Sequence, residues 1–201
     1  MDALIIVDIQ NDFLPGGALA VPRGDEVIPV VNRLQERFGL VVATQDWHPA
    51  GHASFASSHP GKKVYDAVTI DGVEQILWPD HCVQGSRGAE LARAFNTNRV
   101  EAVFRKGTDP RIDSYSAFYD NVRRKSTGLE GYLKWKQVDR VFLAGLAADF
   151  CVSYSIMDAL AMGFGAVLVR DATRAISEDG FRAAERIIRD RGATVVLSAD
   201  T

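Results

Sequence analysis

Six short runs of apolar and mostly β-branched residues recur along the chain and predict buried β-strands. Hydrophobicity is nearly continuous within each run instead of alternating, which is typical of strands in a sheet covered on both faces. The runs occupy residues 3–7, 40–43, 100–104, 141–144, 166–169 and 194–197.

Amphipathic segments separate these runs and predict helices. Asp25 is suited to cap a helix that ends near residue 38, and Ser177 a helix that ends before Gly192. Further helices are expected over residues 149–162, 89–95 and 129–135. The alternation of strands and helices predicts a three-layer α/β/α, Rossmann-like fold with a six-stranded, mainly parallel sheet. We expect residues 1–201 to form a single domain.

One long segment interrupts the alternation. Residues 47–87 show no clear periodicity, and an irregular stretch of this length inside a compact domain is usually functional. The segment also contains all four histidines of the chain, which are His48, His52, His59 and His81. Chance clustering of exposed loop histidines is the alternative to a binding site.

Composition and charge exclude several classes of protein. The 201 residues carry a formal net charge of −3, which argues against a protein that binds nucleic acid through a basic face. No run of about 18 apolar residues is present, so we expect no membrane span. The first residues lack the features of a secretory signal, and two cysteines are too few for a disulfide scaffold. A cytoplasmic location is therefore expected.

Polar side chains follow four of the predicted strands. Asp8 follows the first strand, Asp46 and His48 the second, Lys106 the third and Cys151 the fourth. Ligands of parallel α/β sheets bind outside the carboxyl ends of the strands, so these side chains are expected to share one site. Taken singly, each has another interpretation: a turn residue for Asp8, a solvated strand end for Lys106 and a small core residue for Cys151.

Cys151 is the candidate nucleophile. We expect it in the first turn of a helix, where unpaired amides and the positive end of the helix dipole favour a thiolate. Lys106 would favour ionisation further, and Asp8 could accept the thiol proton and later pass it to a leaving group. Cys82 follows His81 in a loop with no helix after it, and we expect it to be structural.

Asp46-Trp47-His48 is a candidate metal-binding motif. Alternate residues of an extended chain share a face, so Asp46 and His48 can both point toward one ion. His81 and His52 are available from the long segment to complete the ligand set. Carboxylate and imidazole ligands suit Zn²⁺ or Fe²⁺ and do not suit Ca²⁺.

Five stretches of the chain, in order, resemble the nicotinamidases of the isochorismatase-like hydrolase superfamily. VDIQNDF by itself marks only the superfamily, whereas the other motifs are specific to members of the nicotinamidase type. The stretches are VDIQNDFLPGGALAV (7–21), TQDWHPAGHASFA (44–56), LWPDHCVQGSRGAEL (77–91), RKGTDPRIDSYSAF (105–118) and GLAADFCV (145–152).

The resemblance implies a role for each matched residue. The implied sets are a catalytic triad of Asp8, Lys106 and Cys151, metal ligands Asp46, His48 and His81 with His52 as an additional candidate, and substrate-pocket aromatics Phe13, Trp78 and Tyr115. It also implies a cis peptide bond before Ala147 and an oxyanion hole formed by the amides of Ala147 and Cys151. Core packing is the alternative for each of the three aromatic residues.

The resemblance further implies the reaction and its partners. The expected activity is metal-assisted hydrolysis of nicotinamide to nicotinate and ammonia in NAD salvage, with pyrazinamide as a second substrate. One divalent ion, Zn or Fe(II), is expected as cofactor, together with a small-molecule substrate and no nucleic-acid or membrane partner. Assembly into a homo-oligomer stays open.

Three other functions remain as alternatives. Another cysteine amidase would keep the triad without needing the histidines, and His48 and His81 argue against it. In a metallohydrolase, a metal-bound water would attack the substrate and Cys151 would be a bystander. A binding module of the same fold would lack at least one member of the triad, and none is missing here.

Overall fold

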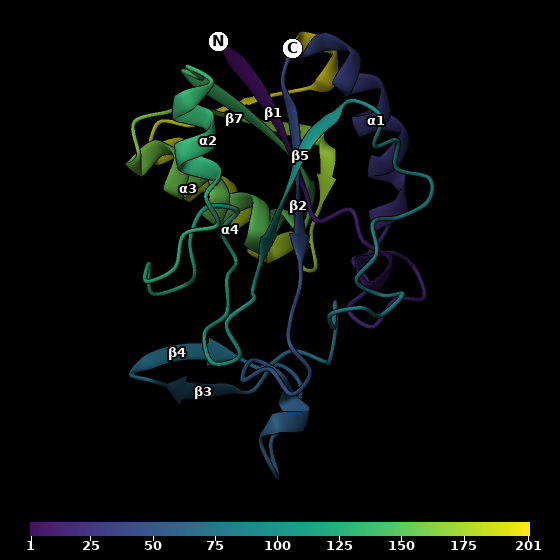
Figure 1. Ribbon diagram of the computed structural model, residues 1–201, viewed down its shortest axis with the longest axis vertical. Coiled ribbons are helices and arrows are strands. Elements are labelled where there is room, and N and C mark those ends of the chain that lie inside the picture. Colours follow the sequence, from purple (N-terminus) through teal and green to yellow (C-terminus); the bar gives the residue numbers. More distant parts are fainter.

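A six-stranded parallel sheet forms the centre of the computed structural model, which describes all residues from 1 to 201 (Figure 1). The strand order is β5-β2-β1-β6-β7-β8, and every neighbouring pair is parallel. The strands are β1 (Asp2–Val7), β2 (Val41–Asp46), β5 (Val100–Lys106), β6 (Arg140–Leu146), β7 (Gly165–Arg174) and β8 (Thr194–Val196). The predicted number of strands is confirmed, and the mainly parallel sheet is entirely parallel.

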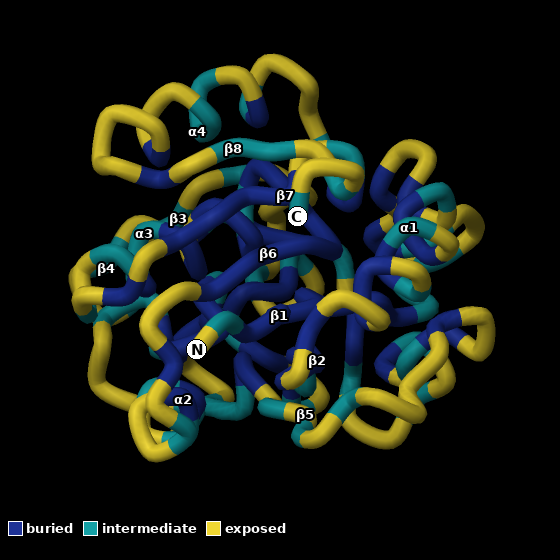
Figure 2. The backbone as a smooth tube through the Cα atoms, turned by 90° about the horizontal axis from the view of Figure 1, so that it is seen from above, coloured by how far each residue is buried: buried dark blue, intermediate teal, exposed yellow.

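Helices cover both faces of the sheet, as expected for a three-layer fold. Alternate residues of β1 point to opposite faces: Leu4 and Ile6 belong to one core cluster, and Ile5 and Val7 to the other. The first cluster contains the apolar face of α1 (Val27–Leu34). The second contains apolar residues of α2 (Leu129–Trp135), α3 (Ser153–Ala161) and α4 (Glu178–Asp190). The central strands are therefore buried between two layers of helices (Figure 2).

Two helix predictions are confirmed: the helix after Ser177, which is α4, and the helix over residues 129–135, which is α2 and has no side-chain cap. Ser177 accepts a hydrogen bond from the Gly180 N–H at 3.2 Å and caps α4 as predicted. Asp25 does not cap α1, because it lies within a 3₁₀ turn (Gly24–Glu26) and the helix begins at Val27. The helix expected over 149–162 begins instead with a π-helical turn (Ala148–Val152) and becomes α-helical at Ser153.

The prediction of a helix over residues 89–95 is wrong. The backbone of this segment is bonded to the chain that follows β1: the Ala92 N–H donates to the Ile9 carbonyl at 2.8 Å, and the Asn11 N–H donates to the Glu90 carbonyl at 3.1 Å. These bonds use groups that a helix would need, so the segment forms turns and one β-bridge.

The long irregular segment contains a small antiparallel hairpin, β3 (Ala67–Ile70) and β4 (Val73–Ile76), that the sequence did not predict. Its strands are only four residues long, and all but one of their residues are exposed or half-buried, so they lack the continuous apolar pattern of the central strands. In Figure 1 this segment lies beyond the carboxyl ends of β2 and β5. No helix of the structure has both the length and the apolar character needed to cross a membrane.

Candidate active site and metal centre

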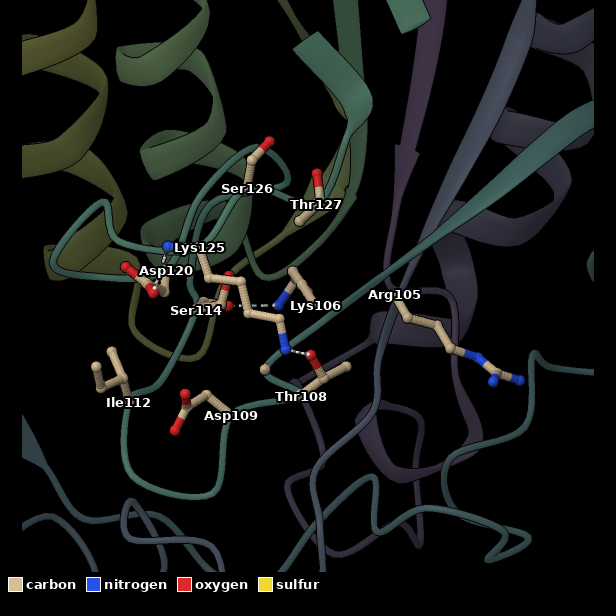
Figure 3. Close-up of a pocket in the computed structure, with 11 residues that line it drawn as sticks. Arg105, Lys106, Thr108, Asp109, Ile112, Ser114, Asp120, Lys125, Ser126 and Thr127 are labelled. Carbon is tan, nitrogen blue, oxygen red and sulfur yellow. Dashed lines mark hydrogen bonds between the residues drawn. The ribbon is translucent and has the colours of Figure 1, made fainter. Parts of the chain in front are cut away.

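Lys106, the last residue of β5, is the centre of a buried cluster of charged groups. Its Nζ lies 2.9 Å from Asp8 Oδ2, 2.7 Å from Asp46 Oδ1 and 3.4 Å from Cys151 Sγ. It also donates a hydrogen bond of 3.0 Å to the Ser114 carbonyl, which is visible in Figure 3. Lys106 is 1% exposed, so its ammonium is held entirely by these partners. The structure thus brings Asp8, Lys106 and Cys151 together.

Asp8 is held in place by the neighbouring strand. It follows β1 in the left-handed region with φ of 49°, and its Oδ1 accepts a 2.7 Å hydrogen bond from the Thr44 hydroxyl. The Thr44 oxygen in turn accepts the Asp8 N–H at 3.2 Å. Burial raises the pKa of Asp8, whereas Lys106 and Thr44 act to lower it. Sequence reasoning missed Thr44, although it lies two residues before Asp46 on β2 and therefore shares its face.

Cys151 lies in the π-helical turn before α3, where its thiol is buried. Burial raises the pKa of the thiol well above its ordinary value, and Lys106 opposes this only in part. Burial therefore works against the expected thiolate. Loss of solvent is the largest influence on the thiol, ahead of the attraction of Lys106. A base must then take the thiol proton, and ligand atoms of Asp8 and Cys151 lie within 4.8 Å of each other.

Asp46, His48 and His81 form a second cluster, in which one potential ligand atom of each residue lies within 4.8 Å of the others. Asp46 Oδ2 is 3.5 Å from His48 Nε2 and 3.8 Å from His81 Nε2. Both Nδ1 atoms face backbone carbonyls, of Gly107 at 3.0 Å and of Pro79 at 2.8 Å. Nδ1–H donation to these carbonyls leaves Nε2 as a lone-pair donor, which is the usual orientation of histidine ligands.

The chemistry of this cluster fits a divalent metal ion. Burial opposes ionisation of Asp46, but Lys106 and His48 hold its pKa well below the ordinary value, so it is a carboxylate. His48 Nε2 is buried and has no hydrogen-bond partner. Gly107, at φ of 64°, permits the arrangement, because a Cβ at this position would lie 2.4 Å from His48 Cε1. The three residues could therefore hold a metal ion through one oxygen and two nitrogens.

The other two histidines have different surroundings. The His52 ring lies 4.5 Å from that of His48, but its Nδ1 accepts the Ser54 N–H at 3.1 Å. His52 is not part of the three-residue cluster, although its Nε2 is buried without a hydrogen-bond partner. The His59 Nε2 contacts the Ala53 carbonyl at 2.7 Å. Of the four histidines, the structure thus brings only His48 and His81 together with Asp46.

A pocket lies beside Cys151 and is lined mainly by apolar and aromatic side chains. The aromatic rings meet edge to face: the centroid of the Phe150 ring lies 4.9 Å from that of Trp78 and 5.5 Å from that of Tyr115. The three expected aromatics all line it, whereas sequence reasoning missed Phe150 and Asp113. The lining residues are Phe13, Leu19, Asp46, Trp78, His81, Asp113, Tyr115, Ala147, Phe150, Cys151 and Ile176. Such walls suit a flat aromatic molecule.

Ala147 and Cys151 both line this cavity. The peptide bond between Leu146 and Ala147 is cis, as the resemblance implied. Ala147 lies just beyond the end of β6, and its N–H donates no hydrogen bond within the chain. This N–H is therefore free to bind an oxygen atom of a ligand in the cavity.

A second pocket, lined in part by Lys106, is almost entirely polar (Figure 3). Its polar groups are bonded to one another: Lys125 Nζ donates to Thr108 Oγ1 at 2.6 Å, and the Lys125 N–H donates to Asp120 Oδ2 at 2.8 Å. The connection between β5 and α2 also contains Ser114, whose backbone carbonyl accepts the hydrogen bond from Lys106 Nζ. We infer that the polar cavity wall supports the lysine.

Comparison with known proteins places this site in a family. Residues 2–200 match the isochorismatase domain. The nicotinamidase of Escherichia coli is 48% identical over 179 residues, which cover 87% of this chain and 84% of that protein. An Acinetobacter baumanii nicotinamidase/pyrazinamidase structure superposes with a TM-score of 0.97 at 42% identity, covering 99% of this chain and 97% of that one.

A metal-bound structure is also similar. The pyrazinamidase of Pyrococcus horikoshii in complex with zinc has a TM-score of 0.80 and 36% identity, with 98% of each chain covered. The sequence resemblance and the fold class are thus confirmed. The chain belongs to the isochorismatase family.

Proposed function

We propose that the chain is a nicotinamidase, an amidohydrolase that converts nicotinamide to nicotinate and ammonia. One observation carries the proposal: a buried thiol, carboxylate and ammonium converge beside an aromatic cavity that is also lined by Asp46 and His81 of the candidate metal-binding cluster. The similarity to nicotinamidases over almost the whole chain supports it. Pyrazinamide, whose ring differs by one atom, is expected to enter the same shape-based pocket.

Asp46, His48 and His81 would hold one divalent metal ion, which we propose to be Zn²⁺ or Fe²⁺. The donor set suits these ions, and the zinc complex of the similar pyrazinamidase supports the assignment. When bound, the ion supplies a Lewis-acid site for the pyridine nitrogen, directly or through water. Phe13, Trp78 and the other aromatic walls hold the ring, so that its carboxamide faces Cys151.

The chain's own groups carry the covalent steps. Asp8 accepts the thiol proton, and the Cys151 sulfur attacks the amide carbon. The N–H groups of Ala147 and Cys151 bind the resulting oxyanion, and removal of such a donor typically costs about 10²- to 10³-fold in rate. Asp8 then donates this proton to the amide nitrogen, which leaves as ammonia when the C–N bond breaks, and afterwards accepts a proton from the water that cleaves the thioester. Lys106 keeps Asp8 oriented throughout.

The remaining expectations extend this proposal. We propose that residues 1–201 form one catalytic domain that acts in NAD salvage. A cytoplasmic setting suits two cysteines that are both free thiols, because a reducing compartment keeps them so.

Replacing the nucleophile tests the proposal. Cys151→Ala should abolish ammonia release from nicotinamide while metal content is unchanged, because Cys151 is not among the metal ligands. Cys82→Ala is the matched control, since Cys82 is also buried but lies outside the cavity lining, and it should retain turnover. Near-normal turnover by the Cys151 variant would leave a metallohydrolase, in which the thiol is a bystander, as the better description.

A further inference from the structure

The β3–β4 hairpin forms part of the surroundings of the cavity without belonging to the main sheet. It pairs only with itself, and its residues are exposed or half-buried with one exception, Gln75, which is 5% exposed. A two-stranded hairpin is at best marginally stable alone in water, so its position depends on contacts with the rest of the chain. Gln75 is the residue that supplies a buried contact.

The side-chain amide of Gln75 reaches three acceptors. Its Nε2 lies 2.6 Å from the Ile76 carbonyl, 3.1 Å from Tyr115 Oη and 3.3 Å from Asp113 Oδ2. The same Tyr115 oxygen accepts a hydrogen bond from Trp78 Nε1 at 3.3 Å. The Gln75 amide therefore contacts the Tyr115 phenol and the buried Asp113 carboxylate directly, and it is linked to Trp78 through the Tyr115 oxygen. These two aromatic residues form one wall of the cavity, the Tyr115–Trp78 wall.

The partners of Gln75 line the cavity, but Gln75 does not. Trp78, Asp113 and Tyr115 all face the cavity that contains Cys151. Burial, with a smaller contribution from Asp113, raises the pKa of Tyr115, so its phenol stays neutral and can receive two donated hydrogen bonds. Removing the Gln75 donor would leave buried oxygens of Tyr115 and Asp113 with fewer partners, and buried polar atoms without partners are costly.

We propose that Gln75 is a positioning residue, which holds the Tyr115–Trp78 wall from behind and thereby determines substrate affinity and selectivity for the aromatic ring. This inference rests on the proposed nicotinamidase function. If the wall relaxes, an unsubstituted ring loses contacts, whereas a ring with an extra substituent gains room. The reacting groups, Asp8, Lys106 and Cys151, make no hydrogen bond with the Gln75 side chain, so the effect belongs in KM and selectivity rather than in kcat.

Gln75→Met tests the inference because methionine keeps the volume of glutamine but cannot donate. Ammonia release by metal-replete enzyme is measured on nicotinamide and on 5-methylnicotinamide. We expect KM for nicotinamide to rise about fivefold, as for one lost hydrogen bond, with kcat within about twofold. The preference for nicotinamide, as a ratio of kcat/KM values, should fall by about fivefold or more. This ratio does not depend on the fraction of folded enzyme.

Glu74→Met is the matched control, since Glu74 is the exposed neighbour of Gln75 on the same strand, and both quantities should stay at the wild-type values. Should Gln75→Met not fold, Tyr115→Phe removes the shared oxygen and should shift the selectivity in the same direction. An unchanged KM and selectivity in the variant used would overturn the inference, as would a loss confined to kcat. If the unmodified protein releases no ammonia from nicotinamide, the proposed function itself fails first.

Discussion

Replacing Lys106 by methionine probes the electrostatic centre of the site. Methionine fills most of the same space but carries no charge, so Asp8 and Asp46 lose the ammonium that lies within 2.9 Å of both. Both carboxylates are almost fully buried, at 0% and 4% exposure, and no solvent can replace the lost partner.

The expected loss of stability is large. Breaking a buried ion pair by removing one partner costs about 3–5 kcal/mol. In a chain of this size, that corresponds to a fall in Tm of about 6–20 °C. Lys106 also contacts the Cys151 sulfur and helps to orient Asp8, so the variant should release no ammonia.

The pH dependence of the loss identifies its cause. Lys106 lowers the pKa of both Asp8 and Asp46, so its removal raises both in the folded protein relative to the unmodified protein. Two raised pKa values mean that the folded variant binds more protons than the folded unmodified protein. The stability of the variant relative to the unmodified protein therefore rises as pH falls. The difference in unfolding free energy between the two proteins should be largest at pH 8 and shrink toward pH 5.

Chemical denaturation in the presence of a chelator measures this difference without a contribution from metal binding. The exposed Lys62→Met is the control, and its unfolding free energy should match that of the unmodified protein. The electrostatic reasoning is refuted if Lys106→Met loses less than about 1 kcal/mol at pH 8, or if the loss is the same at pH 5.

Two further predictions concern the metal site. Gly107→Ala places a Cβ 2.4 Å from His48 Cε1, so His48 must move and metal content after dialysis should fall; Gly51→Ala, also at positive φ but with no atom within 4 Å, should keep its metal. Equal metal content in the two variants would mean that His48 is not a ligand. Asp46→Ala should lose metal and substrate affinity together, measured by elemental analysis and KM, and full retention of metal would contradict the ligand set.

The sequence by itself determined the fold class and the edge of the sheet at which the candidate site lies. Continuous apolar runs between amphipathic segments require a parallel sheet covered on both faces, and parallel strands end at one edge. Asp8, Asp46, Lys106 and Cys151 are therefore neighbours in space because each follows, or ends, a strand of the parallel sheet. This deduction depends only on the spacing of apolar residues along the sequence and on the common direction of parallel strands.

Tertiary structure alone decided which hydrogen bonds hold these groups in place and in which direction their pKa values shift. Gln75 carries no sequence signal of its own, and Thr44 has only its position two residues before Asp46. Their roles arise from the oxygen atoms that the folded chain places beside them. The raised pKa of the Cys151 thiol likewise depends on burial, because the loss of water outweighs the attraction of the nearby Lys106 charge. The pattern of hydrophobic and polar residues indicates which residues prefer the interior. Hydrogen-bond partners and desolvation, in contrast, depend on segments that meet only after folding.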